Sequence, residues 1–214
     1  MKKLSRQEIA ARVAADIPES AIVNLGIGMP TLIQNHLEPN KEILLHSENG
    51  VLGMGPSPKA GQEDDDLINA GKQYVTLING GAYFHHADSF AMMRGGHIDY
   101  CVLGAFQVSL SGDLANWHTG APDAIPAVGG AMDLAIGAKQ VFVMTELFTK
   151  DGECKIVKQC SYPVTGIACV DRIYTDIALF EVTDKGLAVR EIYSDHSFED
   201  LIQMTKLPLI NAPR

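Results

Sequence analysis

A carboxylate between an apolar segment and a glycine-rich turn is the feature of this sequence with the clearest chemical use. Residues 43–45 are apolar enough for a buried strand, and Glu48 follows shortly after, within the tetrapeptide SENG at residues 47–50. Glycines and prolines at residues 50–58 favour tight turns, so we expect neither a regular helix nor a central strand there. Ligands bind outside the carboxyl ends of strands in open α/β sheets, which places Glu48 to meet a substrate. A solvated turn glutamate fits the local pattern equally well.

A second candidate for chemistry is the glycine pair that precedes an apolar, helix-like run. Gly129 and Gly130 stand directly before residues 131–137, so their backbone amides would lie at a helix N-terminus. Such amides suit an oxyanion, a thioester carbonyl or a phosphate, although a tight turn that lets the helix pack closely explains the pair as well. The other glycine turn, at residues 26–30, lacks the third glycine and the acidic residue of a dinucleotide site, which argues against a nicotinamide cofactor.

The acidic, histidine and cysteine residues do not have the spacing of a metal site. The acidic run at residues 63–66 has no EF-hand pattern around it and is typical of a solvated loop and helix cap. The adjacent His85 and His86 point in different directions on a helix or a strand, so capping, packing or contact with an anionic ligand is expected rather than zinc. The four cysteines form no CxxC pair, which indicates free thiols in a reducing cytoplasm.

Composition and charge narrow the class of protein. The 214 residues fit one domain, and a formal net charge of -9 argues against a nucleic-acid-binding protein. An anionic substrate would therefore need a locally cationic pocket. No segment has the apolar length of a signal peptide or a membrane span, so we expect a cytoplasmic protein that does not enter membranes.

The elements that would position these residues alternate between helices and strands. Residues 5–17 predict an opening helix capped by Ser5, and residues 198–204 a closing one. Strands are expected at 21–25, 74–78, 99–103, 139–145, 171–183 and 187–192, and further helices at 31–37 and 90–94. Glycines 80 and 81 are expected to end the strand at 74–78. This order predicts an α/β domain over residues 1–214, with a single open, mostly parallel sheet and helices on both faces.

Five segments together carry a family resemblance over nearly the whole chain. NLGIGMPTLI, SENGVLGMGP, INGGAYF, MMRGGHID and PAVGGAMDLAIGAK occur in this order and resemble the B subunit of the family I coenzyme A transferases, the 3-oxoacid CoA-transferase group. The combination of SENG with GGAMDL is highly specific. EDDDLINAGKQ, FHHADSF and GDLANWHTGAPDAIPAVGGAMDL are more similar to members that act on 3-oxoadipate than to acetoacetate-specific members.

The resemblance implies the CoA-transferase fold and a ping-pong reaction through Glu48. Its carboxylate would attack succinyl-CoA, pass through a mixed anhydride, and become a glutamyl-CoA thioester that hands coenzyme A to 3-oxoadipate in the breakdown of aromatic compounds. It also implies donors to the thioester oxygen at Gly129 and Gly130. The amides of Asn24 and Asn49 would polarise the acyl oxygen or satisfy turn backbone. Positive charge for a dicarboxylate is expected from Arg94, His85 and His118. Coenzyme A thioester is then a substrate, and no metal or permanently bound cofactor is expected.

A partner chain is also implied. Fused family members carry a further half with a glycine-rich GGFG segment that this sequence lacks, so we expect a separate A subunit, a heterodimer or heterotetramer, and a site at the contact between unlike subunits. An acetoacetate-specific B subunit is the nearest alternative. A sugar-phosphate isomerase, a regulatory ligand-binding domain or a non-catalytic scaffold subunit stay open as alternatives of other classes.

Overall fold

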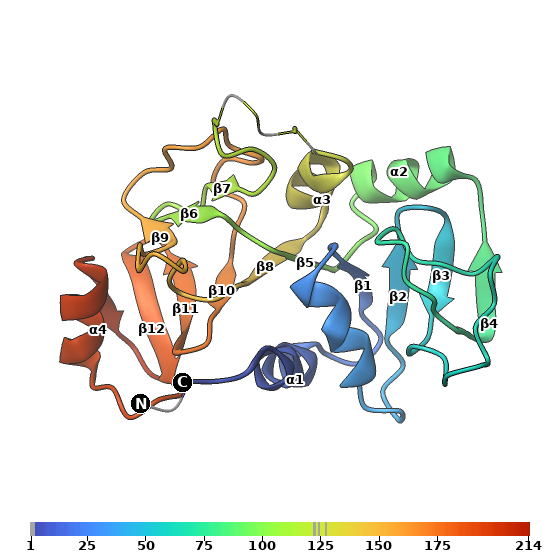
Figure 1. The fold of residues 1–214 in the computed structure, drawn as a ribbon, viewed down its shortest axis with the longest axis horizontal. Helices are drawn as coiled ribbons and strands as arrows, with labels where there is room; N and C mark the ends of the chain where they lie inside the picture. The colour runs from blue at the N-terminus through green and yellow to red at the C-terminus, as the bar shows by residue number, and fades with distance from the viewer. Residues whose placement is uncertain (1–2, 122, 124, 127) are drawn as a thin grey trace.

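The chain folds around one large twisted sheet and a small second one. The computed structural model describes residues 3–121, 123, 125–126 and 128–214. The large sheet is formed by β1 (Ile22–Leu25), β2 (Leu44–Ser47), β3 (Val51–Met54), β4 (Leu77–Tyr83), β5 (Tyr100–Leu103), β8 (Gln140–Met144), β10 (Arg172–Tyr174), β11 (Ala178–Thr183), β12 (Gly186–Ile192) and β13 (Ile210–Asn211). Their spatial order is β13-β12-β11-β10-β8-β5-β1-β2-β3-β4 (Figure 1).

The centre of the large sheet is parallel and its flanks are largely antiparallel. β10, β8, β5, β1 and β2 pair in parallel, while antiparallel pairs add β3 and β4 on one side and β11 and β12 on the other. The predicted open, mostly parallel α/β sheet is therefore confirmed. A small sheet of β6 (Gln107–Ser109), β7 (Leu114–Ala115) and β9 (Ile156–Val157), which the sequence did not predict, lies beyond the ends of β5 and β8.

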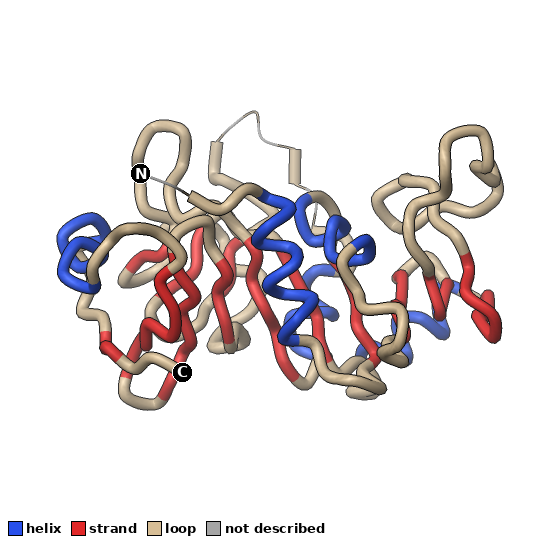
Figure 2. Tube along the Cα trace, turned by 90° about the horizontal axis from the view of Figure 1, so that it is seen from below, coloured by secondary structure: helices blue, strands red, loops and turns tan. Residues whose placement is uncertain are grey.

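Helices cover both faces of the sheet, as predicted. α1 (Arg6–Asp16) and the 3₁₀ helix η1 (Met29–Asn35) lie on one face, and α2 (His86–Arg94) and α3 (Ala131–Gly137) on the other (Figure 1). Viewed from below, a helix crosses the middle strands (Figure 2). Strand β8 shows why both faces are apolar: Val141 and Val143 pack into the core under α2 and α3, whereas Phe142 and Met144 pack into the core over α1.

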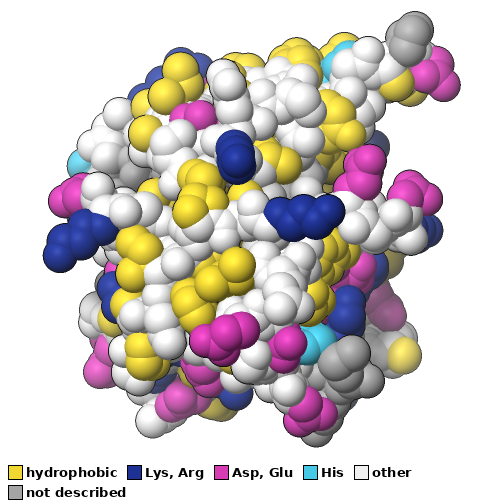
Figure 3. Space-filling model, turned by 90° about the vertical axis from the view of Figure 1, so that its left-hand side faces the viewer, with side chains coloured by type: hydrophobic (Ala, Val, Ile, Leu, Met, Phe, Trp, Pro, Cys, Tyr) yellow, Lys and Arg dark blue, Asp and Glu magenta, His cyan; other side chains and the backbone are white. Residues whose placement is uncertain are grey.

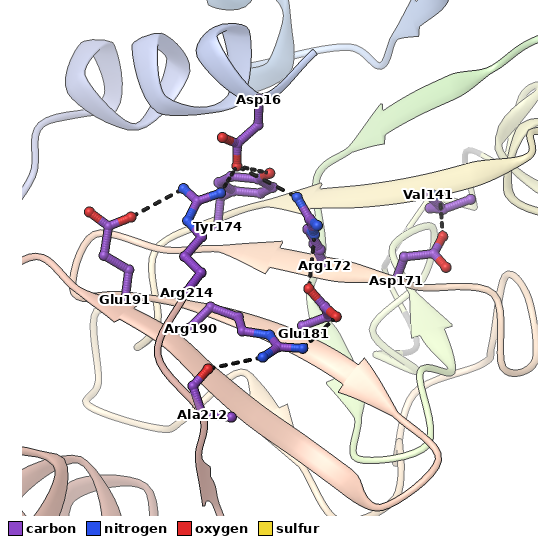
Figure 4. A network of polar contacts seen from close by, with 10 residues as sticks. All are labelled: Asp16, Val141, Asp171, Arg172, Tyr174, Glu181, Arg190, Glu191, Ala212 and Arg214. Atoms are coloured by element: carbon purple, nitrogen blue, oxygen red, sulfur yellow. Dashed lines mark hydrogen bonds and ion pairs between the residues drawn. The ribbon is translucent and has the colours of Figure 1, made fainter. Parts of the chain in front are cut away.

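A shared ion-pair network ties the opening helix to the far strands. Asp16 at the end of α1 accepts hydrogen bonds from Tyr174 Oη and Arg214 Nη1, both at 2.7 Å, and lies 3.7 Å from Arg172 Nη1. Glu181 on β11 accepts from Arg172 Nε at 3.1 Å (Figure 4). The network therefore joins α1, β10, β11 and residue 214. The helix α4 (Phe198–Thr205) closes the fold at the same end of the sheet.

The predicted start of the first helix is confirmed, whereas three predicted strand boundaries differ because of contacts between distant segments. Ser5 caps α1 with a full capping box, as predicted. The glycine-rich segment after Glu48 nevertheless forms β3, because Gly53 takes φ +80° at a register shift and packs against the backbone of Gly81. β4 likewise runs through glycines 80 and 81 instead of ending there. The strand predicted at 171–183 is two strands, β10 and β11, because Thr175 Oγ1 accepts amides of the following turn.

The surface at the α4 end of the sheet mixes side-chain types. Apolar side chains alternate with single lysine or arginine side chains and with acidic ones, so this side presents no continuous basic surface (Figure 3). None of the helices in the described part of the chain combines the length and the apolar character that a membrane span requires.

Candidate active site at the carboxyl edge of the sheet

One cavity lies where the parallel strands β1, β2, β5 and β8 end. Its volume is about 430 Å³. Because parallel strands point the same way, the residues that follow them converge at one edge, as expected for a ligand site in an open α/β sheet. The strand-end residues in its lining are Asn24, Leu25, Gly26, Ile27, Glu48, Leu103, Gly104, Ala105, Phe106, Met144 and Thr145. The remaining wall comes chiefly from residues 128–131 and Leu134.

The residues of the SENG turn have different roles in the structure. Gly50 N donates to Ser47 O at 3.0 Å, which closes the turn. Ser47 Oγ accepts an amide at 3.0 Å and Asn49 Nδ2 donates to a carbonyl at 2.8 Å, both on the backbone of residues 68–70. Gly50 has φ +106°, and a side chain there would overlap the backbone leading into α2. Three of the four residues therefore hold the turn in place, and Glu48 alone lines the cavity.

Glu48 and the Gly129-Gly130 turn meet in the structure. A methyl group on Gly130 would overlap Glu48 Oε2 and lie 3.2 Å from the ring of Phe90, so the carboxylate rests directly against the glycine α-carbon. Burial raises the pKa of Glu48, nearby His86 lowers it by less, and Asp133 adds to the rise. A partly desolvated carboxylate of raised basicity is a better nucleophile than one in water.

A buried chain of hydrogen bonds supports the strand that carries Glu48. Asn24 Nδ2 donates to the carbonyl of His46 at 3.2 Å, which orients the amide so that its nitrogen also donates to His46 Nδ1 at 2.9 Å. His46 Nε2 then holds the ring proton and donates to Ser89 Oγ at 2.9 Å. Burial lowers the pKa of His46 to about 4, so the ring is neutral at pH 7. Both Asn24 protons are thus committed, and its oxygen is the group left to face the cavity.

Within the described part of the chain, the amides of Gly129 and Gly130 have no hydrogen-bond partner. Gly129 has φ +48° and Gly130 serves as the N-cap of α3 without a side-chain cap. Neither amide donates to another described residue, whereas Ala131 N donates to Val128 O at 3.0 Å. The arrangement leaves two N–H groups at the cavity wall beside the Glu48 carboxylate, where an acyl oxygen could accept them.

The three cationic candidates lie outside the described lining of this cavity. Arg94 Nε donates to Asp133 Oδ1 at 2.6 Å on the surface. His85 caps α2 by accepting a backbone amide, in line with the predicted capping role. His118 Nδ1 accepts an amide at 2.8 Å in its own loop. Asn49 is also outside the lining. Substrate contacts for these side chains stay predictions.

The cavity contains a cation that the sequence did not reveal. Lys155 lines the wall near the end of β8, where its Nζ donates to Thr145 Oγ1 at 2.9 Å. His46 was also missed as a structural support. The sequence shows only that Lys155 lies in a polar segment, between Cys154 and Ile156. It does not show that Lys155 bonds Thr145 and Leu147, which follow β8. No group of three or more His, Cys, Asp or Glu side chains suited to a metal ion occurs among the described residues.

A family model and similar relatives both point to the coenzyme A transferases. The family model described as "Coenzyme A transferase" matches residues 6–203. The B subunit of the 3-oxoadipate CoA-transferase of Pseudomonas putida KT2440 is 69% identical over 209 residues, which cover 98% of each chain. The B subunit of the succinyl-CoA:3-ketoacid coenzyme A transferase of Helicobacter pylori 26695 is 45% identical, covering 94% of this chain and 96% of its own.

A solved structure confirms the fold. The apoenzyme of an acyl-CoA transferase from Escherichia coli O157:H7 superposes with a TM-score of 0.75 at 18% identity, covering 98% of this chain and 42% of the E. coli chain. The superposition covers nearly all of this chain, and at 18% identity it establishes the fold.

Proposed function

We propose that this chain, which belongs to the coenzyme A transferase family, is the B subunit of an enzyme that moves coenzyme A from succinyl-CoA to 3-oxoadipate. The observation that carries the proposal is the placement of the Glu48 carboxylate. It lies half-buried in the cavity at the carboxyl edge of the sheet, against Gly130 and beside two backbone amides that have no partner among the described residues. A carboxylate so placed is suited to covalent catalysis on an acyl thioester.

The proposed reaction proceeds in four balanced exchanges. Glu48 Oε attacks the thioester carbonyl of succinyl-CoA, the C–S bond breaks, and a mixed anhydride forms as the coenzyme A thiolate leaves. The thiolate attacks the glutamyl carbonyl of that anhydride, which releases succinate and leaves a glutamyl-CoA thioester. The carboxylate of 3-oxoadipate then attacks this thioester and displaces the thiolate. The thiolate finally attacks the acyl carbonyl, which releases 3-oxoadipyl-CoA and restores Glu48.

The glycine turn supports the proposal electrostatically. In each exchange negative charge develops on a carbonyl oxygen held next to Glu48. The Gly129 and Gly130 amides belong to the cavity wall and donate to no other described residue, and they are the proposed donors. One such donor typically lowers a barrier by about 2.7 to 4 kcal/mol. Asn24 has a different proposed task, because its two protons bond His46: it fixes β1 to β2 and so fixes the start of the catalytic turn.

The choice of 3-oxoadipate is supported by the relatives. The relative that matches at 69% has 3-oxoadipate in its name, whereas the one at 45% is named for 3-ketoacids in general. A succinyl-CoA:3-ketoacid activity is therefore the second candidate. Steady-state rates with 3-oxoadipate and acetoacetate as acceptors separate the two.

The cavity also favours a partner chain. Ile27 and Phe106 line it yet are 65% and 41% exposed. An A subunit placed over them would bury apolar surface and keep water from the thioester intermediate. The similar bacterial chains are B subunits by name, which supports such a partner, in a heterodimer or heterotetramer.

The proposed compartment is the cytoplasm. The four cysteines are free thiols, as is usual for proteins in that reducing environment.

Trapping the intermediate tests the proposal. The complex with the A subunit is incubated with succinyl-CoA, reduced with borohydride and mapped by mass spectrometry. We expect the modified side chain at Glu48, and the same label in the control Glu42→Gln, which alters an exposed glutamate just before β2. A label at another residue overturns the mechanism. Unchanged activity of Glu48→Ala in the complex would instead support a non-catalytic scaffold role.

A further inference from the structure

The cavity holds one cation opposite the proposed nucleophile. Among the described residues of its lining, only Glu48 and Lys155 carry charge. Lys155 is half-buried, and burial lowers its pKa, while Glu146 and Asp176 favour its charged form. Both of these acids are already paired with other cations, Glu146 at 2.9 Å and Asp176 at 3.0 Å. No ion pair between described residues includes Lys155, so its charge is available to a ligand.

The position of the ammonium group is set by several hydrogen bonds. Lys155 N donates to Leu147 O and Val108 N donates to Lys155 O, both at 2.9 Å, so its backbone is held on two sides. Its Nζ donates to Thr145 Oγ1 at 2.9 Å, and that hydroxyl donates onward to Ala105 O at 3.4 Å. One ammonium proton is therefore used, and two remain for an anion.

The two charges stand at opposite ends of the row of strand ends. Glu48 follows β2, and the Lys155 ammonium bonds the residue that follows β8, with β5 and β1 between. Three inter-strand spacings of about 4.8 Å separate the β2 and β8 axes, or about 14 Å. A carboxylate side chain reaching in from one end leaves room for a short acyl chain before the ammonium at the other.

We propose that Lys155 binds the carboxylate of a dicarboxylic acyl group that stays free while the other end of that group reacts at Glu48. The inference rests on the proposed function. Succinyl and 3-oxoadipyl groups both have such a second carboxylate, and acetoacetyl has none. In a ping-pong reaction both acids occupy the same cavity in turn, so one cation serves both. Lys155 is then the residue that selects dicarboxylic over monocarboxylic acyl groups.

Half-reactions of the complex with its A subunit test the assignment. Formation of the glutamyl-CoA thioester is followed with succinyl-CoA and with acetoacetyl-CoA, which share coenzyme A and differ in the free carboxylate. Loss of one partner of a desolvated charge pair lowers binding by at least about 30-fold. We expect Lys155→Met to lower kcat/KM for succinyl-CoA and 3-oxoadipate by about that factor, with acetoacetyl-CoA nearly unchanged. Lys155→Arg should recover part of the loss.

Controls separate the outcomes. Lys158→Met removes an exposed lysine three residues away and should leave both substrates at wild-type values. Thr145→Val, which frees the ammonium without removing it, should give a smaller loss confined to dicarboxylates and keeps the test valid if Lys155→Met does not fold. An equal loss with both thioesters would assign Lys155 to coenzyme A and overturn the inference, as would wild-type values. A wild-type complex that forms no thioester with either substrate would refute the proposed function itself.

Discussion

Acid should destabilise this protein through one buried histidine beneath the proposed nucleophile. His46 is 1% exposed and neutral, with a pKa lowered by burial from 6.5 to about 4. The unfolded chain binds a proton at this site below about pH 6.5 and the folded chain does not, so stability falls as pH drops through that window. At 1.36 kcal/mol per pKa unit, the loss reaches about 2 kcal/mol by pH 5 and about 3 kcal/mol by pH 4.

Urea unfolding of the purified chain at several pH values measures this loss. His46→Asn removes the titrating ring, so its free energy of unfolding should be lower at pH 7.5 but should fall less steeply than that of the wild type between pH 6.5 and 4. His97→Gln, an exposed histidine, controls for removal of a ring as such. Equal slopes for wild type and His46→Asn would refute the reasoning. So would a His46 imidazole that titrates near pH 6.5 by NMR, a reading that needs no variant.

Three further substitutions separate catalysis from folding. Glu48→Gln should reduce the rate of coenzyme A transfer by at least about 10⁴-fold. It should also raise the melting temperature at pH 7, because burying a neutral amide costs less than burying a carboxylate. A lower melting temperature would contradict the burial of the carboxylate. Gly130→Ala places a methyl group against the Glu48 carboxylate. It should lower kcat by about 100-fold while the circular dichroism spectrum stays that of the wild type. A wild-type kcat would show that the carboxylate acts from another position. Asp16→Asn should cost about 2 kcal/mol in urea unfolding, while kcat stays at the wild-type value; a parallel fall in kcat would mean that the α1 network reaches the cavity.

The parts of the site that follow from local pattern could be predicted from the sequence. The strand before Glu48 and the glycine pair before α3 are both set by short-range features, namely an apolar run that stops and a turn that starts a helix. Because parallel strands end at one edge, two such signals converge in space even though a long stretch of chain separates them. Glu48 and the glycine pair therefore meet at the cavity because each belongs to an element that the local sequence predicts and the parallel topology brings both to one edge.

Features that depend on strand neighbours could not be read in this way. Glycine-rich β3 and β4 form because Gly53 and Gly81 let two backbones approach closely, a contact that neither segment indicates alone. His46 looked like the end of a strand, and its role depends on the register that pairs it with Asn24 of β1. Lys155 depends on a small sheet that joins β9 to β6. Hydrophobic periodicity reports which face of a strand is buried, and it does not report which strand lies beside it.

The proposed catalytic turn and the histidine that supports it carry two burial costs of opposite pH dependence. Glu48 has a folded pKa above its unfolded value, so its burial destabilises the protein progressively as pH rises from about 4.5, the reference value for the exposed carboxyl. His46 destabilises it as pH falls below about 6.5. Between these limits one cost grows while the other shrinks, so the wild-type stability is flatter with pH than either group alone would make it. Removing the Glu48 charge should therefore make the free energy of unfolding fall more steeply as the pH drops below about 6.5. The contribution of the site to stability can be measured only when Glu48 and His46 are both varied.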